Sequence, residues 1–297
     1  MIVIFNPAAG QRRAQTLWRV LDVLASSGVR LSIVETRHAG HARTLAESAT
    51  RDGEDLVVTA GGDGTIAEVA AGITAGMAGC THTPAMGVIP IGTANVLARE
   101  LKLPFAPRAV ASALAFGRTR RLWPGIARGP EGERLFVQML GVGLDAQVVH
   151  HLPLGLKRFA GRLAYVAQTL REMPRYCYAG IRAEIDGRKV EAASIIVCKG
   201  TLYAGPFTLA PDAQPGEPGF TVALFGARGP MGALMYGAAL PLNLLPYAPG
   251  LILQRAKSIK ILGSGASRVM AQADGDPAGN TPLEITDSVA PLRIVVG

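Results

Sequence analysis

The residues best able to do chemistry in this sequence form a glycine-rich turn behind an apolar run. In order, they are Gly61, Gly62, Asp63, Gly64 and Thr65. Glycine permits positive φ angles and lets backbone N–H groups come close to an anion. A helix that starts directly after such a turn adds unpaired N–H donors and a partial positive charge. The turn therefore predicts a binding site for phosphate groups.

An acidic residue within this turn adds a further requirement. Asp63 would repel a phosphate unless a divalent cation lay between them, so we predict that it organises Mg²⁺ or a Mg²⁺-bound water. The alternative is that Asp63 only closes the turn. No Lys-Ser/Thr pair follows, which excludes a Walker A loop. Thr65 and Glu68 match the capping-box pattern T-x-x-E and predict that the following helix starts there.

Two further turns follow predicted strands in the same way. Gly92 and Thr93 lie behind an apolar run, and Thr93 offers a hydroxyl and a backbone N–H to a phosphate oxygen, or else serves as an ordinary helix N-cap. Asn6 begins a third turn, which ends at Gly10. In an open α/β sheet, nucleotides bind in a crevice at the carboxyl ends of the strands. The three turns are therefore predicted to line one crevice.

Strands and helices alternate along the first part of the chain. Apolar runs predict strands at 2–5, 31–35, 56–60 and 86–89. Periodic apolar residues predict helices at 12–27, 41–51 and 65–76, with another that begins near Asn95. This alternation predicts an α/β domain, residues 1–117, built on a parallel sheet with helices on both faces.

The remainder, residues 118–297, has a different pattern and begins with the charged run 118–121. Predicted strands lie at 136–140, 181–185, 193–198, 220–225, 259–262, 269–273 and 292–296. Helices are predicted at 157–173 and 230–239. We predict a mostly antiparallel β-sandwich domain. On residue type alone, Asp274-Gly275-Asp276-Pro277 is a surface turn between two of its strands, 269–273 and 283–285.

The composition of the chain indicates which type of partner it binds and in which cellular compartment it is expected. The 297 residues carry a net charge of +8, which favours an anionic partner such as a phosphorylated molecule or an acidic membrane surface. Only 5% of the residues are aromatic and no nucleic-acid-binding motif is present, so nucleic acid is not an expected partner. Three scattered cysteines without a CxxC pair, and the lack of a signal-peptide pattern, predict a cytoplasmic protein.

Two segments bear on contact with a membrane. Residues 231–253 carry no charge, but glycines and prolines interrupt them and argue against a spanning helix, which leaves core packing or an apolar rim as alternatives. The predicted helix 157–173 either packs on the sandwich or contacts anionic headgroups at the inner membrane face. Its apolar stripe consists of Phe159, Leu163, Val166 and Leu170, and its basic residues are Lys157, Arg158, Arg162 and Arg171.

Taken together and in order, these motifs resemble the diacylglycerol-kinase catalytic domain family, which includes bacterial lipid kinases and the sphingosine and ceramide kinases. The matching motifs are Asn6-Pro7-x-x-Gly10, Gly61-Gly62-Asp63-Gly64-Thr65, Pro90-x-Gly92-Thr93-x-Asn95, Gly141-x-Gly143-x-Asp145-Ala146, Ala210-Pro211 and Ala273-Asp274-Gly275-Asp276. The resemblance implies an N-terminal domain similar to those of NAD kinase and phosphofructokinase. It also implies an enzyme of lipid metabolism and phospholipid biosynthesis, which transfers the γ-phosphate of ATP to the hydroxyl of diacylglycerol, a sphingoid lipid or a related membrane lipid.

The resemblance further implies roles for individual residues. ATP phosphates would bind over Gly61–Thr65 and Thr93, with Asn6 at the same edge and Thr36 at a nucleotide-contacting position. The late acidic motif would supply the general base that takes the proton from the lipid hydroxyl, and a carboxylate suits that role. Asp274 and Asp276 are jointly the candidates for this base, with Asp63 as the third catalytic residue, acting with Mg²⁺.

Three positions depart from the family pattern. Val96 stands where many members carry an aspartate, and Asp276 where glutamate is common. Glu217, flanked by prolines, stands where similar bacterial kinases place a cation-binding aspartate, and is a second candidate metal ligand. Two other functions therefore stay open. One is a soluble-metabolite kinase, because NAD kinase and 6-phosphofructokinase resemble the same Gly-Gly-Asp-Gly loop. The other is a non-catalytic regulator that binds a nucleotide or a lipid.

Overall fold

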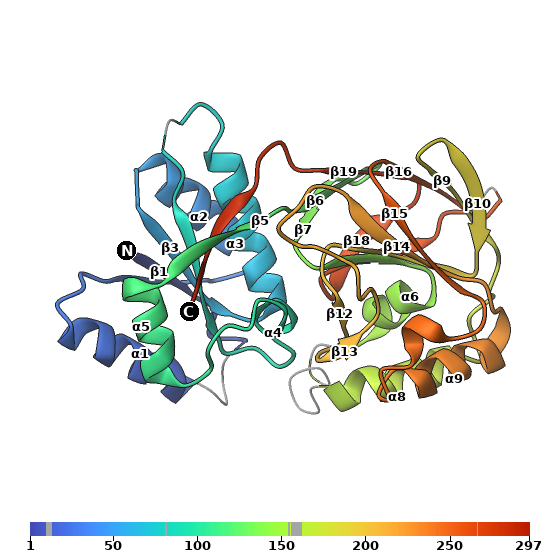
Figure 1. Ribbon diagram of the computed structural model, residues 1–297, viewed down its shortest axis with the longest axis horizontal. Coiled ribbons are helices and arrows are strands. Elements are labelled where there is room, and N and C mark those ends of the chain that lie inside the picture. Colours follow the sequence, from blue (N-terminus) through green and yellow to red (C-terminus); the bar gives the residue numbers. More distant parts are fainter. Residues whose placement is uncertain (10–13, 81, 154, 156–161, 266) are drawn as a thin grey trace. The chain divides into compact units, whose positions relative to one another are not determined.

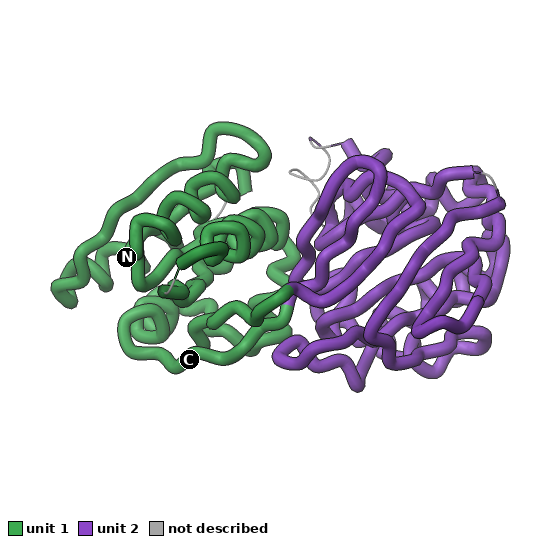
Figure 2. The backbone as a smooth tube through the Cα atoms, turned by 90° about the horizontal axis from the view of Figure 1, so that it is seen from above, with its two compact units in different colours: residues 1–123, 289–297 green, residues 124–288 purple. Residues whose placement is uncertain are grey.

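The chain divides into two compact units. The computed structural model describes all residues except 10–13, 81, 154, 156–161 and 266 (Figure 1). Unit 1 comprises Met1–Trp123 and Val289–Gly297, and unit 2 comprises Pro124–Ser288 (Figure 2). Unit 2 is therefore an insertion in the chain of unit 1. The backbone N–H of Ser288 donates to the carbonyl of Pro124 over 3.0 Å, so the inserted segment begins and ends at the same place.

Unit 1 is built on a six-stranded sheet with the order β2-β1-β3-β4-β20-β5. Its strands are β1 (Ile2–Phe5), β2 (Ser32–Glu35), β3 (Leu56–Gly61), β4 (Ala85–Pro90), β5 (Arg118–Leu122) and β20 (Leu292–Val296). Neighbouring strands are parallel except β20 and β5, which are antiparallel. The predicted α/β domain with a parallel sheet is confirmed.

Helices cover this sheet on both faces. They are α1 (Ala14–Ser26), α2 (His41–Arg51), α3 (Asp63–Gly76), α4 (Val96–Glu100) and α5 (Pro107–Phe116). Leu17 and Leu21 of α1 share a buried cluster with Val3 and Val58 of the sheet. Successive strand residues point to opposite faces, and Ile4, next to Val3, is also fully buried. Both faces of the sheet are thus covered, as parallel sheets require.

The predicted domains, residues 1–117 and 118–297, differ from the two units at both places where the chain passes between them. Residues 118–121 were expected to open the second domain, but they form most of β5 in unit 1. Residues 292–296 were expected in the β-sandwich, but as β20 they lie between β4 and β5. The reason is that strands pair with partners far away in the sequence. An apolar run such as Leu292–Val296 predicts a strand, but it does not predict which strand lies beside it.

Unit 2 contains two six-stranded antiparallel sheets, with the orders β10-β9-β16-β19-β6-β7 and β15-β14-β11-β8-β17-β18. The first comprises β6 (Gly125–Gly129), β7 (Gly132–Phe136), β9 (Ile181–Ile185), β10 (Arg188–Ala192), β16 (Ile259–Gly263) and β19 (Leu283–Asp287). The second comprises β8 (Met139–Val142), β11 (Ser194–Cys198), β14 (Phe220–Phe225), β15 (Leu251–Ala256), β17 (Met270–Ala273) and β18 (Asp276–Asn280). A separate pair is formed by β12 (Leu202–Tyr203) and β13 (Phe207–Thr208).

One core joins the two large sheets. Phe136 and Ile259 of the first sheet cluster with Leu140 and Val222 of the second. The predicted β-sandwich is therefore confirmed. One predicted strand is wrong: 136–140 is not continuous, because β7 ends at Phe136 and β8 begins at Met139 in the other sheet.

The helices of unit 2 are α6 (Leu144–His151), α8 (Arg162–Glu172), α9 (Gly229–Ala239) and the short 3-10 helix η1 (Leu245–Tyr247). The predicted helix at 230–239 is thus confirmed, and the predicted helix at 157–173 matches α8 from Arg162 onward. Its first residues, including Lys157, Arg158 and Phe159, lie outside the described residues, as do Gly10 and Arg12 of unit 1. No helix in the described part of the chain is both long enough and apolar enough to cross a bilayer.

Candidate active site

The two glycine turns of unit 1 pack directly against each other. They follow β3 and β4, which are parallel neighbours with Gly61 opposite Pro90. The N–H of Gly92 donates to the carbonyl of Gly61 over 3.1 Å. A Cβ atom on Gly92 would lie 2.4 Å from the Cα of Gly62, which no real contact allows. Glycine is therefore required at Gly92 by close backbone approach, and the two turns form one edge as predicted.

The second turn ends in a left-handed residue. Asn95 is the N-cap of α4, with φ of 50°, so the alternative that Thr93 caps this helix is wrong. Thr93 is exposed beside the contact between Gly62 and Gly92. Its hydroxyl and backbone N–H are therefore not used by α4 as a cap.

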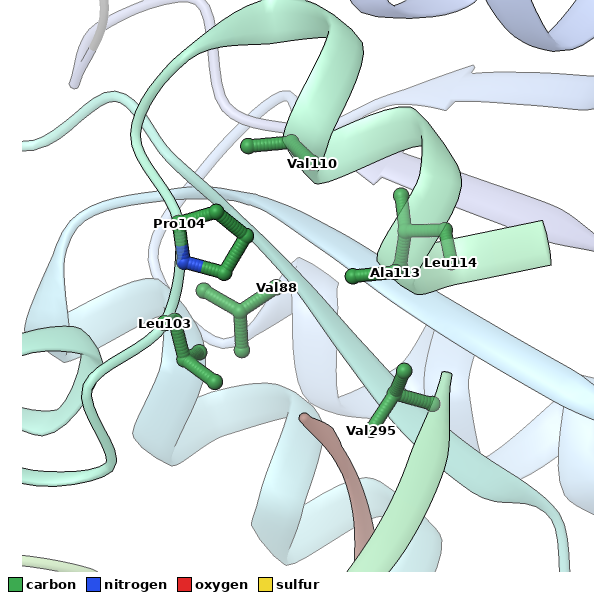
Figure 3. Close-up of a pocket in the computed structure, with 7 residues that line it drawn as sticks. All are labelled: Val88, Leu103, Pro104, Val110, Ala113, Leu114 and Val295. Carbon is green, nitrogen blue, oxygen red and sulfur yellow. The ribbon is translucent and has the colours of Figure 1, made fainter. Parts of the chain in front are cut away.

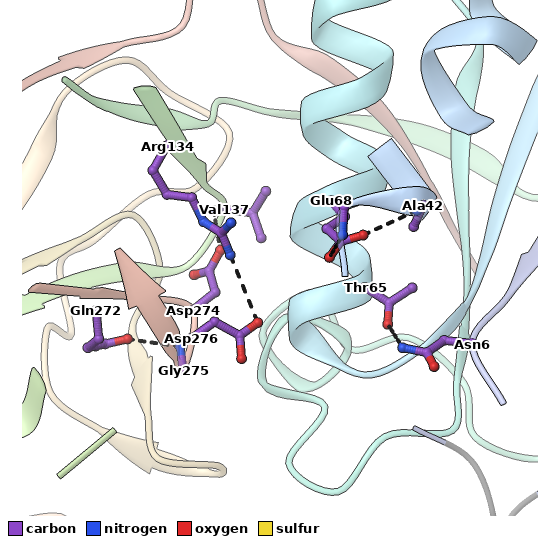
Figure 4. Close-up of polar contacts among 11 residues, drawn as sticks. Asn6, Ala42, Thr65, Glu68, Arg134, Val137, Gln272, Asp274, Gly275 and Asp276 are labelled. Carbon is purple, nitrogen blue, oxygen red and sulfur yellow. Dashed lines mark hydrogen bonds and ion pairs between the residues drawn. The ribbon is translucent and has the colours of Figure 1, made fainter. Parts of the chain in front are cut away.

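The helix after the first turn begins without a side-chain cap. α3 starts at Asp63 with Gly62 as its N-cap, and this glycine provides no side-chain hydrogen bond to cap the helix. The capping box predicted for Thr65 and Glu68 is wrong. The Glu68 carboxylate instead accepts hydrogen bonds from the N–H groups of Gly40 and Ala42, at the start of α2 (Figure 4). Because its own first donors are uncapped, α3 offers its N-terminus to an anion.

Asn6 ties the third turn to the first. Its side-chain amide donates to the hydroxyl of Thr65 over 2.9 Å (Figure 4), and its side-chain oxygen accepts from the N–H of Ala8. Thr36 follows β2 and donates its N–H to the carbonyl of Phe5 over 2.8 Å, so it lies at the same carboxyl edge of the sheet. Unit 1 therefore brings the predicted residues Asn6, Thr36 and Gly61–Thr65 to one sheet edge.

Asp63 points toward the start of α4. Its carboxylate accepts from the N–H of Leu97 over 3.3 Å. Burial raises the pKa of Asp63 above its ordinary value, while the N–H groups of Leu97, Val96, Asp63 itself and Asn95 act in the opposite direction. Nearby, Asn95 is fully buried and its side-chain oxygen has no hydrogen-bond partner among the described residues. An amide oxygen without a partner and a carboxylate are both oxygen donors, the type of ligand that a hard cation such as Mg²⁺ or a cation-bound water prefers.

The acidic motif of unit 2 lies on a tight hairpin turn. It joins β17 to β18, with Ala273 opposite Asp276. The two turn residues, Asp274 and Gly275, both have positive φ, 50° and 84°. A two-residue hairpin turn with two left-handed residues is typical of type I′, which favours Asp-Gly. The surface turn expected from residue types is present, although its second strand is β18 rather than 283–285.

The two aspartates of this turn have different surroundings. The carboxylate of Asp274 accepts hydrogen bonds from three consecutive backbone N–H groups, those of Val137, Gln138 and Met139, over 2.7, 2.9 and 2.9 Å. This bridge occupies the break between β7 and β8. Asp276 is half-buried, with 35% of its side chain exposed, and its carboxylate lies 4.0 Å from Arg134 (Figure 4). Asp274 is thus an anchor of the turn, and Asp276 presents its carboxylate at the surface.

A buried polar chain supports the same turn from below. The hydroxyl of Tyr203 donates to one oxygen of Asp145 and the amide of Gln272 to the other, each over 2.6 Å. Gln272 in turn accepts from the N–H of Gly275 over 2.8 Å. Burial raises the pKa of Asp145 and opposes ionisation, whereas the two donors favour it. Tyr203 and Gln272 carry no sequence signal for this role, because only the fold brings them to Asp145.

Glu217, the second candidate metal ligand, lies in a loop that already contains a cation. Its backbone carbonyl accepts from the side-chain ammonium of Lys199 over 3.1 Å. No group of three or more metal-ligating side chains occurs in the described part of the chain. At Glu217 the positive charge of Lys199 already lies in the loop, which argues against a metal ion there.

A small cavity in unit 1 has a different character (Figure 3). It lies behind β4 and is lined by Val88, Leu103, Pro104, Val110, Ala113, Leu114 and Val295. All of these side chains are apolar, so the cavity offers no group that could orient a phosphate or a hydroxyl. It is a packing cavity rather than part of the site.

Comparison with known proteins decides the family. The family model named diacylglycerol kinase catalytic domain matches residues 1–125, and that named YegS C-terminal NAD kinase beta sandwich-like domain matches residues 138–296. This chain belongs to the diacylglycerol-kinase catalytic domain family. At the level of the family it is a lipid kinase, and therefore an enzyme, as the sequence motifs predicted.

Diacylglycerol kinases of other organisms are similar to this chain over nearly its full length. It is 28% identical to the diacylglycerol kinase of Staphylococcus haemolyticus over 94% of this chain and 83% of that protein. It is also 28% identical to the diacylglycerol kinase of Staphylococcus aureus strain MRSA252, over 94% of this chain and 87% of that protein. A solved structure of a proposed diacylglycerol kinase from Bacillus anthracis is similar with a TM-score of 0.78 and 20% identity, covering 100% of this chain and 96% of that one. That structural likeness supports the fold.

Proposed function

We propose that this protein transfers the γ-phosphate of ATP to the hydroxyl of a membrane lipid such as diacylglycerol or a sphingoid lipid. The observation that carries the proposal is the contact between Gly62 and Gly92, which places the uncapped N-terminus of α3 beside a second glycine turn. Two glycine turns and an open helix N-terminus are suited to a chain of phosphates. The relatives named above carry the name of an enzyme with this activity.

Unit 1 holds the donor in this proposal. The first N–H groups of α3 and the N–H and hydroxyl of Thr93 bind phosphate oxygens. Asn6 holds the hydroxyl of Thr65 in place, and Thr36 contacts the nucleotide. Asp63 and the side-chain oxygen of Asn95 would hold Mg²⁺ or its water, and the cation would supply charge neutralisation for the phosphates. Val96 replaces an acidic residue at the start of α4, so Asp63 has to serve this cation without that second carboxylate.

Unit 2 supplies the proton acceptor. Asp276, on its rigid turn, takes the proton from the lipid hydroxyl as the hydroxyl oxygen forms a bond to the γ-phosphorus. The bond between that phosphorus and the bridging oxygen breaks, and ADP leaves. The carboxylate of Asp274 already accepts three backbone hydrogen bonds, so Asp274 positions the turn rather than receiving the proton.

The surface of α8 supports contact with an anionic membrane. Leu163, Val166 and Leu170 are 73%, 56% and 55% exposed, whereas the face of α8 that packs inward carries buried Gln168 and Glu172. These three side chains do not pack on the sandwich, and their exposure supports the alternative of contact with a membrane. An amphipathic helix that turns its apolar side outward and its polar side inward leaves apolar area for a partner to cover.

Charge and a second helix favour a lipid surface as that partner. Exposed Arg171 and Arg175 lie beside this stripe and line a polar hollow with Gln147 and His151. α9 lies along the same margin of unit 2 in Figure 1, and its Met231 and Leu234 are exposed. Cationic side chains flanking apolar ones complement anionic headgroups over acyl chains. We infer a cytoplasmic protein that binds peripherally to the inner membrane face.

A transfer assay tests the proposed reaction. Purified protein is incubated with Mg²⁺, radiolabelled ATP and extracted total lipid, and the labelled lipid is identified by chromatography and mass spectrometry. We expect one class of hydroxyl lipid to acquire the label, and no label in that class with the Asp276→Asn variant. ATP binding by this variant, measured by calorimetry, should be unchanged.

The alternatives predict different results. Strong turnover with NAD as acceptor, and none with lipid, would replace the proposal with a soluble-metabolite kinase. ATP binding without transfer to any lipid in a broad panel would instead indicate a regulator.

A further inference from the structure

The loop that precedes β14 encloses a side-chain ammonium. The ammonium nitrogen of Lys199 donates to the carbonyls of Glu217 and Gly219, over 3.1 and 2.8 Å, and to one oxygen of Asp287 over 2.8 Å. It also lies 4.8 Å from the centre of the Phe220 ring. The Lys199 side chain is 0% exposed. A fully buried lysine is rare unless its charge is matched, so this arrangement calls for an explanation.

The number of acceptors matches an ammonium ion. A protonated lysine has three N–H donors and no acceptor, whereas a neutral amine has only two donors. The three oxygens therefore satisfy the charged form completely. Magnesium needs about six oxygen ligands and calcium six to eight, whereas the ammonium of Lys199 contacts three oxygens, two from the loop and one from Asp287. The second oxygen of Asp287 already accepts from the N–H of Gly219 over 2.6 Å.

Burial and the Asp287 carboxylate act in opposite directions on the pKa of Lys199. Burial lowers the pKa of the Lys199 amine below its ordinary value, whereas Asp287 raises it through a hydrogen bond and its opposite charge. Asp287 is only 20% exposed, so its carboxylate would be poorly solvated without the ammonium. Each buried charge thus needs the other.

We propose that the Lys199 ammonium is a built-in cation of this loop, taking the place of a metal ion at Glu217. The site has the oxygen chemistry of a cation site, two loop carbonyls and a carboxylate, and the chain itself supplies the cation. It joins three elements: the end of β11, the loop before β14 and the end of β19, which belongs to the opposite sheet of the sandwich.

The backbone of Lys199 contacts the segment that holds the acidic turn. The N–H of Lys199 donates to the carbonyl of Gln138 over 2.9 Å. Gln138 is one of the three residues whose N–H groups hold Asp274. The backbone of Lys199 therefore pairs with the segment that holds the Asp274 carboxylate.

Thermal unfolding of the full chain without nucleotide tests the proposal. Any response of the Tm to EDTA, Mg²⁺ or Ca²⁺ at matched ionic strength should be the same in the wild-type protein and in the Glu217→Gln variant, because the proposed Mg²⁺ site at Asp63 belongs to unit 1. The Tm of the Lys199→Ala variant should be lower by roughly 6 °C or more, because the mostly buried charge of Asp287 then has no opposite charge beside it. Methylammonium, which fits the space of the missing group, should restore part of that loss. Lys260→Ala is the matched control, since Lys260 is a half-exposed lysine of unit 2. Its Tm should stay close to that of the wild type and should not rise with methylammonium.

Two results would overturn the built-in cation. One is a rise in the wild-type Tm with Mg²⁺ or Ca²⁺ that the Glu217→Gln variant lacks, because the loop would then bind a metal itself. The other is a Lys199→Ala variant whose Tm equals that of the wild type in EDTA. If that variant is too unstable to purify, Lys199→Met with Asp287→Asn should recover stability relative to Lys199→Met alone, and failure to do so would count against the proposal equally. None of these measurements depends on kinase activity, so they are independent of the proposed function.

Discussion

At the scale of single residues, the hairpin turn of unit 2 separates two aspartates that sequence cannot separate. Both are acidic, and only one residue lies between them. The carboxylate of Asp274 is held by three backbone N–H groups, whereas Asp276 exposes 35% of its side chain. Hydrogen bonds that fix a carboxylate to the backbone make it an anchor, and partial exposure makes a carboxylate accessible to a substrate.

The two aspartates should therefore respond differently to substitution. Asp276→Asn is expected to lower kcat by about 10²- to 10⁴-fold, the usual contribution of a general base, and to leave Tm unchanged. Asp274→Asn should lower Tm, since each lost hydrogen bond to a charged group costs about 1.5–3 kcal/mol. Steady-state kinetics and thermal unfolding measure both effects. An Asp276→Asn variant with full turnover would exclude Asp276 as the base.

Gly92 gives a second residue-scale prediction. Gly92→Ala should lose ATP binding and destabilise the protein by about 1–3 kcal/mol, because the new methyl group would meet the Cα of Gly62 at 2.4 Å. Isothermal titration with ATP and chemical unfolding measure these effects. Gly237→Ala, in α9, is the control: nothing lies within 4 Å of its Cβ position, so it should be neutral or slightly stabilising. Unchanged ATP affinity in Gly92→Ala would contradict the role of the paired turns.

The buried carboxyl of Asp145 predicts a pH dependence of stability. Its pKa is raised by burial, so between the ordinary value and the raised one the folded state binds more protons than the unfolded state. The contribution of Asp145 to the free energy of unfolding therefore falls as pH rises through that window, by about 1.4 kcal/mol per unit of the pKa difference. Urea unfolding of wild type and Asp145→Asn from pH 4 to 8 measures this, and the wild type should lose stability relative to the variant. A constant difference would show that the pKa is not raised.

At the scale of elements, α8 differs from an ordinary surface helix, because polar side chains lie on its buried face and large apolar ones on its exposed face. Its buried positions include Gln168 and Glu172, which bond to each other over 2.8 Å, and Glu172 also accepts from Gln147 of α6. Its large aliphatic residues Leu163, Val166 and Leu170 face solvent, whereas the small Ala164 is buried. A polar inner face is satisfied by hydrogen bonds, but the outer apolar face has no partner within the described part of unit 2.

Serine substitutions on that outer face test its role. Leu163→Ser with Leu170→Ser should weaken sedimentation with anionic phospholipid vesicles by roughly tenfold or more, because two exposed leucines no longer bury apolar area in the bilayer. Transfer to a short-chain, water-soluble lipid should be unchanged. Leu262→Ser, on β16, is the control, since Leu262 is also half-exposed but lies on the sandwich. Equal vesicle binding by all three proteins would refute a membrane-facing α8.

At the scale of the whole molecule, the chain leaves unit 1 and returns to it. β20 enters the sheet between β4 and β5, with Leu292 and Ile294 essentially buried. Unit 1 therefore cannot complete its sheet until the last nine residues, Val289–Gly297, are available. The inserted unit 2, by contrast, has both of its ends hydrogen-bonded together at Pro124 and Ser288.

Removal of Val289–Gly297 should consequently affect the two units unequally. The free energy of unfolding of unit 1 is expected to fall by more than about 5 kcal/mol, because several buried apolar side chains are removed at once. Unit 1 should also lose ATP binding. Hydrogen exchange should show lost protection in β3 and β4, while the strands of the sandwich stay protected. Removal of Gly297 alone is the control and should change neither unit. Retained protection of β4 in the truncated chain would contradict this view of the sheet.

The sequence alone determined the class of each unit, the glycine turns and the family. These features depend on local patterns: the period of apolar residues, the position of glycines after strands, and the order of short motifs. For the same reason, the strand ranges 181–185 and 220–225 were predicted to the residue. The sequence also placed Asn6, Thr36, Asp63 and Thr93 after the strands whose carboxyl ends share one edge.

Only the tertiary structure decided which partner each of these residues has. The pairing of β20 with β4, the anchoring of Asp274 by residues 137–139 and the chain from Tyr203 to Gly275 all join positions far apart in sequence. The enclosure of Lys199 by Asp287 is of the same kind, because the two residues are 88 positions apart in the sequence. Local pattern fixes what a residue can do, but hydrogen bonding and burial depend on neighbours that the fold brings together. That physical difference separates what could be predicted here from what had to be seen.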